Sequence, residues 1–206
     1  MLRAPIFRIV LILASFFIAP TSYAKEKNPG DSYLFYNLGI SNIEGDVSNS
    51  YGATTRTLTY DQGFGLDVGY GWVNDSLTRI EVSYFNRKAD VLTEAGITSN
   101  TKLELSGIML SGNWDGDNIY GGLGLGLGMA SVTLSANSPI LTADNEALFA
   151  FKATLGSDWS ISESTDIFVQ GEFLYTTFEL NASSGYSTYE LENGTMSIFF
   201  GARQWF

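Results

Sequence analysis

Eight segments of this chain alternate, residue by residue, between an apolar side chain and a small or polar one. The segment 63–72, for example, reads GFGLDVGYGW, and 121–129 reads GGLGLGLGM. Successive side chains of a β-strand point to opposite faces, so this period predicts strands with two unlike faces. The eight segments are 34–41, 63–72, 78–84, 103–114, 119–129, 149–159, 166–175 and 196–206.

The composition of the two faces indicates which solvent each one meets. A soluble β-sandwich would also alternate, but its outer face would be rich in Thr, Lys, Glu and Ser. Here the polar side is mostly Gly with scattered charges, and the other side is Leu, Val, Ile and Phe with aromatic residues at the strand ends. Apolar faces with aromatic girdles are typical of membrane barrels. We therefore predict an all-β fold, an eight-stranded antiparallel up-and-down transmembrane β-barrel.

The connections between the predicted strands differ in length. Short turns rich in Asn, Asp, Gly and Ser alternate along the chain with longer polar stretches. Outer-membrane barrels likewise have short periplasmic turns and longer extracellular loops. The turns are at 73–76, 115–118 and 160–164, and the longer stretches are near 44–56, 89–101, 135–146 and 181–192. We therefore expect four extracellular loops.

All four tryptophans lie at the ends of predicted strands. Trp72, Trp114 and Trp159 each precede a short turn, and Trp205 stands beside the C-terminus. Because tryptophan is enriched where a membrane meets water, we predict that these four residues are membrane-interface anchors.

Residues 1–24 have the layout of a secretory signal peptide. A basic start precedes the apolar stretch 9–18, and a small-residue pattern ends at Ala24. The alternative is a membrane anchor, but an anchor needs about 20 apolar residues and this stretch has roughly half that number. We expect cleavage after Ala24, so that the barrel domain comprises residues 25–206 and leaves the cytoplasm.

Composition excludes several functional classes. The chain has no Cys and no His, which removes thiolate chemistry, the usual general base near neutral pH and the commonest metal ligands. We therefore expect no enzymatic activity, no cofactor and no metal. The formal charge of −11 also disfavours nucleic acid as a partner, because phosphate contacts need clustered Lys and Arg.

The charged residues within the strands decide which face is inside. The opposite phase would point several charges at hydrocarbon, where a basic side chain costs about 2 to 4 kcal/mol at the midplane. We therefore predict a charge network in the barrel lumen, with a structural role in register and plugging favoured over a gated pore. Its members are Asp67, Arg79, Glu81, Lys152, Glu172 and Arg203.

These residues resemble a known family, the small outer-membrane β-barrels of Gram-negative bacteria typified by the OmpA membrane domain, OmpX and the opacity-type proteins. The resemblance covers nearly all of the chain after residue 24. Its carriers are GLDVGYGW at 65–72, RIEVSY at 79–84, the alternating glycines from Gly122 to Gly128 and GARQWF at 201–206. The resemblance implies a location in the outer membrane, and it implies that Phe206 is the insertion signal recognised by the barrel-insertion machinery.

Two functions remain open at this point. The four long stretches carry Tyr among small polar residues and many carboxylates, which favours a surface role with ligand or host contacts made by loops on a plugged barrel. The alternative is a narrow, porin-like channel gated by the lumen ion pairs. Expected partners are outer-membrane lipid and lipopolysaccharide, with no particular oligomeric state predicted. The loop residues considered are Glu44, Asp46, Tyr51, Asp90, Glu94, Asp144, Glu146, Tyr186, Tyr189, Glu190 and Glu192.

Overall fold

A computed structural model describes the protein. It covers residues 28–49, 53–74, 78–94, 96–116, 119–135, 140–182 and 188–206, so the predicted signal peptide at 1–24 lies outside the described residues. The strands are β1 (Ser32–Asn49), β2 (Thr54–Tyr60), β3 (Gly63–Val73), β4 (Thr78–Glu94), β5 (Ile97–Asp115), β6 (Ile119–Leu134), β7 (Leu141–Ser162), β8 (Thr165–Ala182) and β9 (Thr188–Trp205). The part of the chain that the structure describes contains no helical segment with the length and hydropathy of a membrane span.

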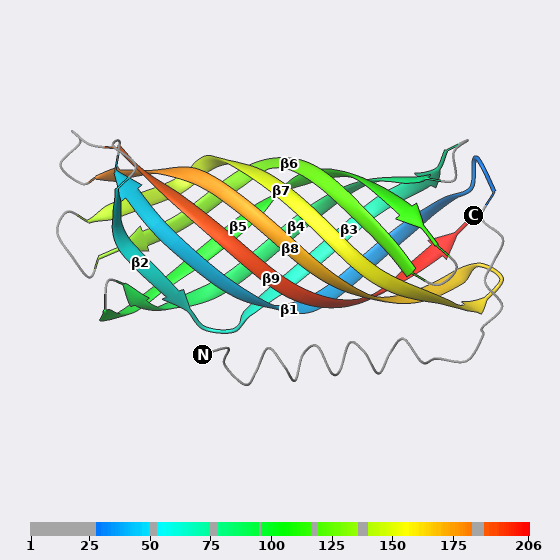
Figure 1. Ribbon diagram of the computed structural model, residues 1–206, viewed down its shortest axis with the longest axis horizontal. Helices are drawn as coiled ribbons and strands as arrows, with labels where there is room; N and C mark the ends of the chain where they lie inside the picture. Colours follow the sequence, from blue (N-terminus) through cyan, green and yellow to red (C-terminus); the bar gives the residue numbers. More distant parts are fainter. Residues whose placement is uncertain are drawn as a thin grey trace.

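The strands form a closed antiparallel barrel (Figure 1). β1 pairs with β3, and each strand from β3 to β8 pairs with the next. β9 then pairs with β1 along seventeen register positions from Tyr33↔Trp205 to Asn49↔Tyr189, which closes the ring. The eight strands of this ring confirm the predicted fold. A shorter strand, β2, pairs with β1 and β4 and continues the wall beyond β3 at one end.

An apolar band surrounds the barrel on its outer face. Exposed side chains of the band come from all eight strands of the ring, and Leu127, Ile108 and Met196 are among the most exposed, at 70%, 63% and 67%. The band begins beside Phe206 at the end that carries the short turns, here called the short-turn end. On β9 it reaches Met196, about ten residues away, and a tilted strand of this length spans the hydrocarbon core of a membrane.

The strands continue past the band at the opposite end, here called the extended end. The prediction of long loops at 44–56, 89–101, 135–146 and 181–192 is therefore wrong for most of those residues, because β1, β4, β5, β7, β8 and β9 run through them. The physical reason is that the outer face of the strands meets lipid within the band and water beyond it. Within the band the apolar face of β8 points outward, as at Phe173, but beyond the band it points inward, as at Phe178 and Leu180.

The lumen is filled by side chains in three successive layers. An aromatic layer at the short-turn end contains Tyr33, Phe35, Val73, Tyr120, Phe168 and Trp205. An ion-pair belt of charged side chains begins among these rings and extends beyond them. Its members are Asp67, Arg79, Glu81, Arg87, Asp115, Lys152, Asp158, Asp166, Glu172 and Arg203. An apolar layer then fills the extended end and includes Ile43, Phe85, Leu103, Leu105, Val132 and Leu191.

Candidate functional site: the lumen and the extended end

Glycines make room for the aromatic layer. Tyr33 lies directly opposite Gly71 in register, Tyr120 lies opposite Gly156, and in each case a Cβ on the glycine would collide with the tyrosine ring. The narrow barrel therefore packs large rings inside by placing each one over a residue with no side chain. This accounts for inner-face glycines such as Gly71 and Gly156, whereas Gly122 and Gly124 lie beside Asn113 and Ser111.

Two arginines stack on the aromatic layer and begin the ion-pair belt. The guanidinium of Arg203 lies 4.2 Å from the ring centre of Phe168 and 4.7 Å from that of Tyr120, and Arg79 lies 4.6 Å from Tyr120. Arg203 Nη1 is 2.7 Å from Asp158 Oδ2, and Arg79 Nη2 is 2.7 Å from Asp115 Oδ1. Each cation is therefore held by both a carboxylate and an aromatic face.

Arg87 is at the centre of the belt. Its Nη1 donates to Asp67 Oδ1 at 2.7 Å, and its Nη2 donates to Glu172 Oε1 at 2.5 Å. The guanidinium also lies 4.5 Å from the ring centre of Phe199. All three charged side chains are almost fully buried, so this pairing joins β3, β4 and β8 across the lumen.

The predicted network residues all face this lumen. Asp67, Arg79, Glu81, Lys152, Glu172 and Arg203 are between 0% and 7% exposed. The hydroxyl of Tyr33 donates to Glu81 Oε1 at 2.6 Å, and Lys152 interacts electrostatically with Glu81 and Glu172.

Sequence analysis missed four members of the belt. Arg87, Asp115, Asp158 and Asp166 also point inward or lie at the edge of the lumen. Arg87 lies beyond the predicted strand 78–84, but it keeps the odd-numbered phase of Arg79 and Glu81. Extending this odd-numbered phase beyond residue 84 would have identified Arg87 as an inward-facing residue.

Trp205 is not a membrane anchor. It is 2% exposed, its ring centre lies 4.5 Å from that of Tyr33, and its Nε1 donates to Asp166 Oδ2 at 2.7 Å. The reason is phase, because Trp205 shares the inward parity of Arg203. Trp114 is exposed at 55%, and Trp72 and Trp159 are half-buried on the outer face. Phe206 is 64% exposed beside the band and packs near Tyr70.

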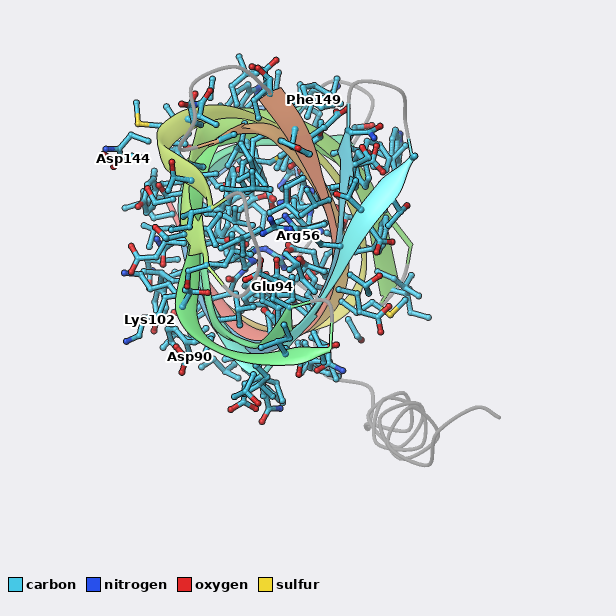
Figure 2. All side chains as sticks on the ribbon, turned by 90° about the vertical axis from the view of Figure 1, so that its left-hand side faces the viewer. Arg56, Asp90, Glu94, Lys102, Asp144 and Phe149 are labelled. Carbon is cyan, nitrogen blue, oxygen red and sulfur yellow. The ribbon has the colours of Figure 1, made fainter. Side chains whose placement is uncertain are left out.

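An ion pair lies inside the mouth of the extended end. Arg56 of β2 donates to Glu94 of β4, and the two side chains are 6% and 0% exposed. Figure 2, which faces this end, shows both residues within the ring of strands. Glu94 is therefore not an exposed loop carboxylate as predicted. An irregularity in register between Val91 and Thr93 shifts the phase of β4 by one residue and turns Glu94 inward.

A buried hydrogen bond fixes the same region. The Tyr60 hydroxyl donates to Asn193 Oδ1 at 2.9 Å, which ties β2 to β9 over Gly45 of the intervening strand β1. Burial raises the pKa of this hydroxyl far above its ordinary value, so Tyr60 remains a donor.

The outer face of the extended end is acidic. Glu179 is opposite Glu190 in register and Asp46 is opposite Glu192, so like charges face each other on neighbouring strands. We call this surface the collar; its members are Glu44, Asp46, Glu179, Glu190 and Glu192. Of the other predicted loop residues, Asp90, Asp144 and Glu146 lie outside the barrel, Tyr189 packs against the apolar layer, and Tyr51 and Tyr186 lie outside the described residues.

No group of three or more Asp, Glu, Cys or His that could hold a metal ion is found in the part of the chain that the structure describes. Several belt hydroxyls, among them those of Ser83, Ser111 and Thr176, are buried and have no hydrogen-bond partner among the described residues. Buried polar groups of this kind are commonly satisfied by water.

Comparison with known proteins places the fold. No protein-family model matches the sequence, and no curated protein matches it. The outer membrane protein OprG from Pseudomonas aeruginosa matches at 16% identity over 87% of this chain and 98% of its own, with a TM-score of 0.50. The outer membrane protein AlkL matches at 15% identity over 91% of this chain and 95% of its own, with a TM-score of 0.53.

Another match is the outer membrane protease OmpT from Escherichia coli, at 9% identity over 90% of this chain and 100% of its own, with a TM-score of 0.40. At such identities the likeness concerns the fold alone. The chain thus has the fold of the small outer-membrane β-barrels of Gram-negative bacteria, and its exposed apolar band fits a location in that membrane.

Proposed function

We propose that the protein is a closed, non-enzymatic outer-membrane barrel whose contacts with partners are made by the outer face of its extended end. The observation that carries this proposal is the apolar layer, in which side chains such as Leu103, Leu105 and Leu191 have no exposed surface. Hydrophobic constrictions exclude ions by dewetting, so a lumen filled in this way favours a plug.

The short-turn end and the belt support the same function. Trp205, Tyr33 and Arg203 pack together at the short-turn end. Breaking one buried ion pair of the belt typically costs about 3 to 5 kcal/mol, so the belt resists opening. With both ends packed, the surface left for partners is the wall beyond the apolar band, in line with the surface role expected from the sequence.

A second candidate function is a narrow channel through the lumen. The unpaired belt hydroxyls of Ser83, Ser111 and Thr176 favour it, because they suit a hydrated belt. The belt contains four basic and six acidic side chains, so a current through it should favour cations. The basic members are Arg79, Arg87, Lys152 and Arg203, and the acidic ones are Asp67, Glu81, Asp115, Asp158, Asp166 and Glu172.

Planar-bilayer conductance separates the two candidates. The refolded barrel, verified by a heat-modifiable gel shift, should give no current steps, whereas Phe85→Ala together with Leu105→Ala, which thins the apolar layer, should give steps. Reproducible wild-type steps that change in Lys152→Met or Glu172→Gln would establish the channel and overturn the closed barrel.

We also propose that Phe206 is the main residue of the insertion signal. Deleting Phe206 should lower the amount of barrel assembled in the outer membrane, because the exposed ring ends the apolar face of β9. Undiminished assembly, measured by the heat-modifiable shift in isolated membranes, would contradict this role.

A further inference from the structure

A row of polar side chains crosses the apolar layer on the inner face of β8 and β9. Thr176 and Asn193 are register partners on these two strands, and Thr195 follows two residues further along β9. All three are 0% exposed. Together with Glu172 of the belt, they form what we call the polar seam. The inward neighbours of the seam along the two strands belong to the apolar layer and are Leu174, Phe178 and Leu191.

The polar seam joins the belt to the mouth of the extended end. At the belt, Glu172 is the register partner of Ser197, which lies two residues beyond Thr195 on the same face of β9. At the mouth, Asn193 Oδ1 accepts the hydrogen bond from the Tyr60 hydroxyl. The seam is therefore a polar strip that runs from the ion pairs of the belt through the apolar layer.

Every member of the polar seam has a side-chain atom that lacks a hydrogen-bond partner. Among the residues that the structure describes, Asn193 Nδ2, Thr176 Oγ1, Thr195 Oγ1 and Glu172 Oε2 are buried and make no hydrogen bond. Arg87 occupies only the other carboxylate oxygen, Glu172 Oε1. Unsatisfied polar groups in apolar surroundings cost free energy, so native proteins usually provide partners for them. Four such atoms along one strip indicate a bound ligand.

The hydrogen-bonding chemistry of the four atoms identifies the ligand. Asn193 Nδ2 can only donate, the Glu172 carboxylate can only accept, and the two threonine hydroxyls can do either. A cation would leave the amide donor unsatisfied, and an anion would leave the carboxylate unsatisfied, whereas water satisfies both. Residues two apart on one face of a strand are about 6.7 Å apart, a gap that one or two water molecules bridge with hydrogen bonds of about 2.8 Å.

We propose that the polar seam binds a file of ordered water molecules, which links Glu172 in the belt to Asn193 at the mouth. The proposal goes beyond the proposed function, which concerns the outer face of the extended end. Buried water is a fixed part of a structure, in which each molecule makes about three hydrogen bonds. The rest of the apolar layer stays dry, because side chains such as Leu103 and Val132 offer no polar atom. The lumen is thus hydrated along β8 and β9 and leaves no room for a hydrated ion.

X-ray radiolytic labelling of the wild-type barrel in micelles tests whether water is bound. Radiolysis turns water into hydroxyl radicals, which oxidise the side chains that touch it. Leu174 and Leu103 are a matched pair, because both are 0% exposed within the apolar layer but only Leu174 is the register partner of a seam residue, Thr195. We expect oxidation of Leu174 and almost none of Leu103. No oxidation of either leucine, or equal oxidation of both, would overturn the proposal.

Two substitutions then test whether the hydroxyls of the seam hold the water. Thr176→Val with Thr195→Val keeps the shape of both side chains but removes both hydroxyls, so the oxidation of Leu174 should be lost. Thr177→Val is the control on the outer face of β8, where the hydroxyl donates to Glu190 Oε1, and it should keep the wild-type labelling. A heat-modifiable gel shift verifies that each variant is folded. Unchanged oxidation of Leu174 in the double variant would contradict a water file on the seam.

The direction of a stability change provides an independent test. If the Thr195 hydroxyl were dry, Thr195→Val would remove an unsatisfied polar group, and the urea midpoint of unfolding in micelles would rise. If the hydroxyl holds water, valine deprives that water of a partner, and the midpoint should fall. A midpoint equal to or above that of the wild type would therefore overturn the water file. Bilayer conductance reports separately on the closed lumen, so the failure of one proposal is distinguishable from the failure of the other.

Discussion

At the scale of single residues, the barrel depends on pairs in which one side chain occupies the space that its partner leaves empty. Tyr120 lies over Gly156, and its hydroxyl donates to Gln170 Oε1 at 3.0 Å. The abundance of glycine on the inner face was visible in the sequence. Which ring covers which glycine depends on cross-strand register, which the sequence pattern did not specify.

Gly156→Val should therefore destabilise the barrel. The new side chain would collide with the Tyr120 ring, and overpacking of this kind typically costs about 1 to 3 kcal/mol. Gly112→Val is the matched control, because a Cβ at Gly112 meets nothing within 4 Å. Urea unfolding in micelles measures both, and equal stability of the two variants would contradict the packing described.

Arg87 and Lys88 provide a second comparison, between neighbouring cations on opposite faces of β4. Arg87→Met leaves Asp67 and Glu172 buried without their shared partner, so it should lower the free energy of unfolding by about 3 to 5 kcal/mol. Lys88→Met breaks a pair whose members are 53% and 49% exposed, and should cost about 1 kcal/mol or less. Similar losses for both variants would show that the belt does not stabilise the fold.

At the scale of strands, the main lesson is the reversal of phase beyond the apolar band. On β5 the apolar residues Ile108 and Leu110 point outward, whereas Leu103 and Leu105 point inward. Alternation therefore predicted the membrane part of each strand well. It failed beyond the band, where apolar side chains point inward and polar side chains point outward. Those stretches of strand were therefore interpreted as polar loops. Bulges added a further error at Glu94, since a one-residue irregularity reverses every side chain after it.

Tryptophan fluorescence tests the assignment of faces. In variants that keep a single tryptophan, lipids with brominated acyl chains should quench Trp114, which is 55% exposed on the outer face. They should leave Trp205 largely unquenched, because it lies within the aromatic layer. Comparable quenching of the two would place Trp205 at the lipid surface and restore the anchor role predicted from the sequence.

At the scale of the whole molecule, the barrel joins a membrane part and an extended part through one continuous wall. The lumen is aromatic at the short-turn end, charged in the middle and apolar at the extended end, and the outer face changes from apolar to acidic at the extended end. The inner charges were predictable, because charges cannot face hydrocarbon. The apolar layer was not, because members such as Val91, Leu141 and Leu191 lie in stretches interpreted as loops, and because Leu103 and Leu105 have the opposite phase to Ile108 and Leu110 within one predicted strand.

The most direct test of the closed lumen is the reactivity of a single cysteine in the apolar layer. Leu105→Cys places a thiol at an inward position with 0% exposure, in a chain with no other cysteine. Lys102→Cys is the reactive control on the outer face, and Ile108→Cys is the lipid-facing one. With a charged thiol reagent, the closed barrel predicts rapid labelling at 102 and almost none at 105 or 108. Labelling of 105 at a rate close to that of 102 would mean that water and ions reach the centre of the lumen, and would contradict the closed barrel.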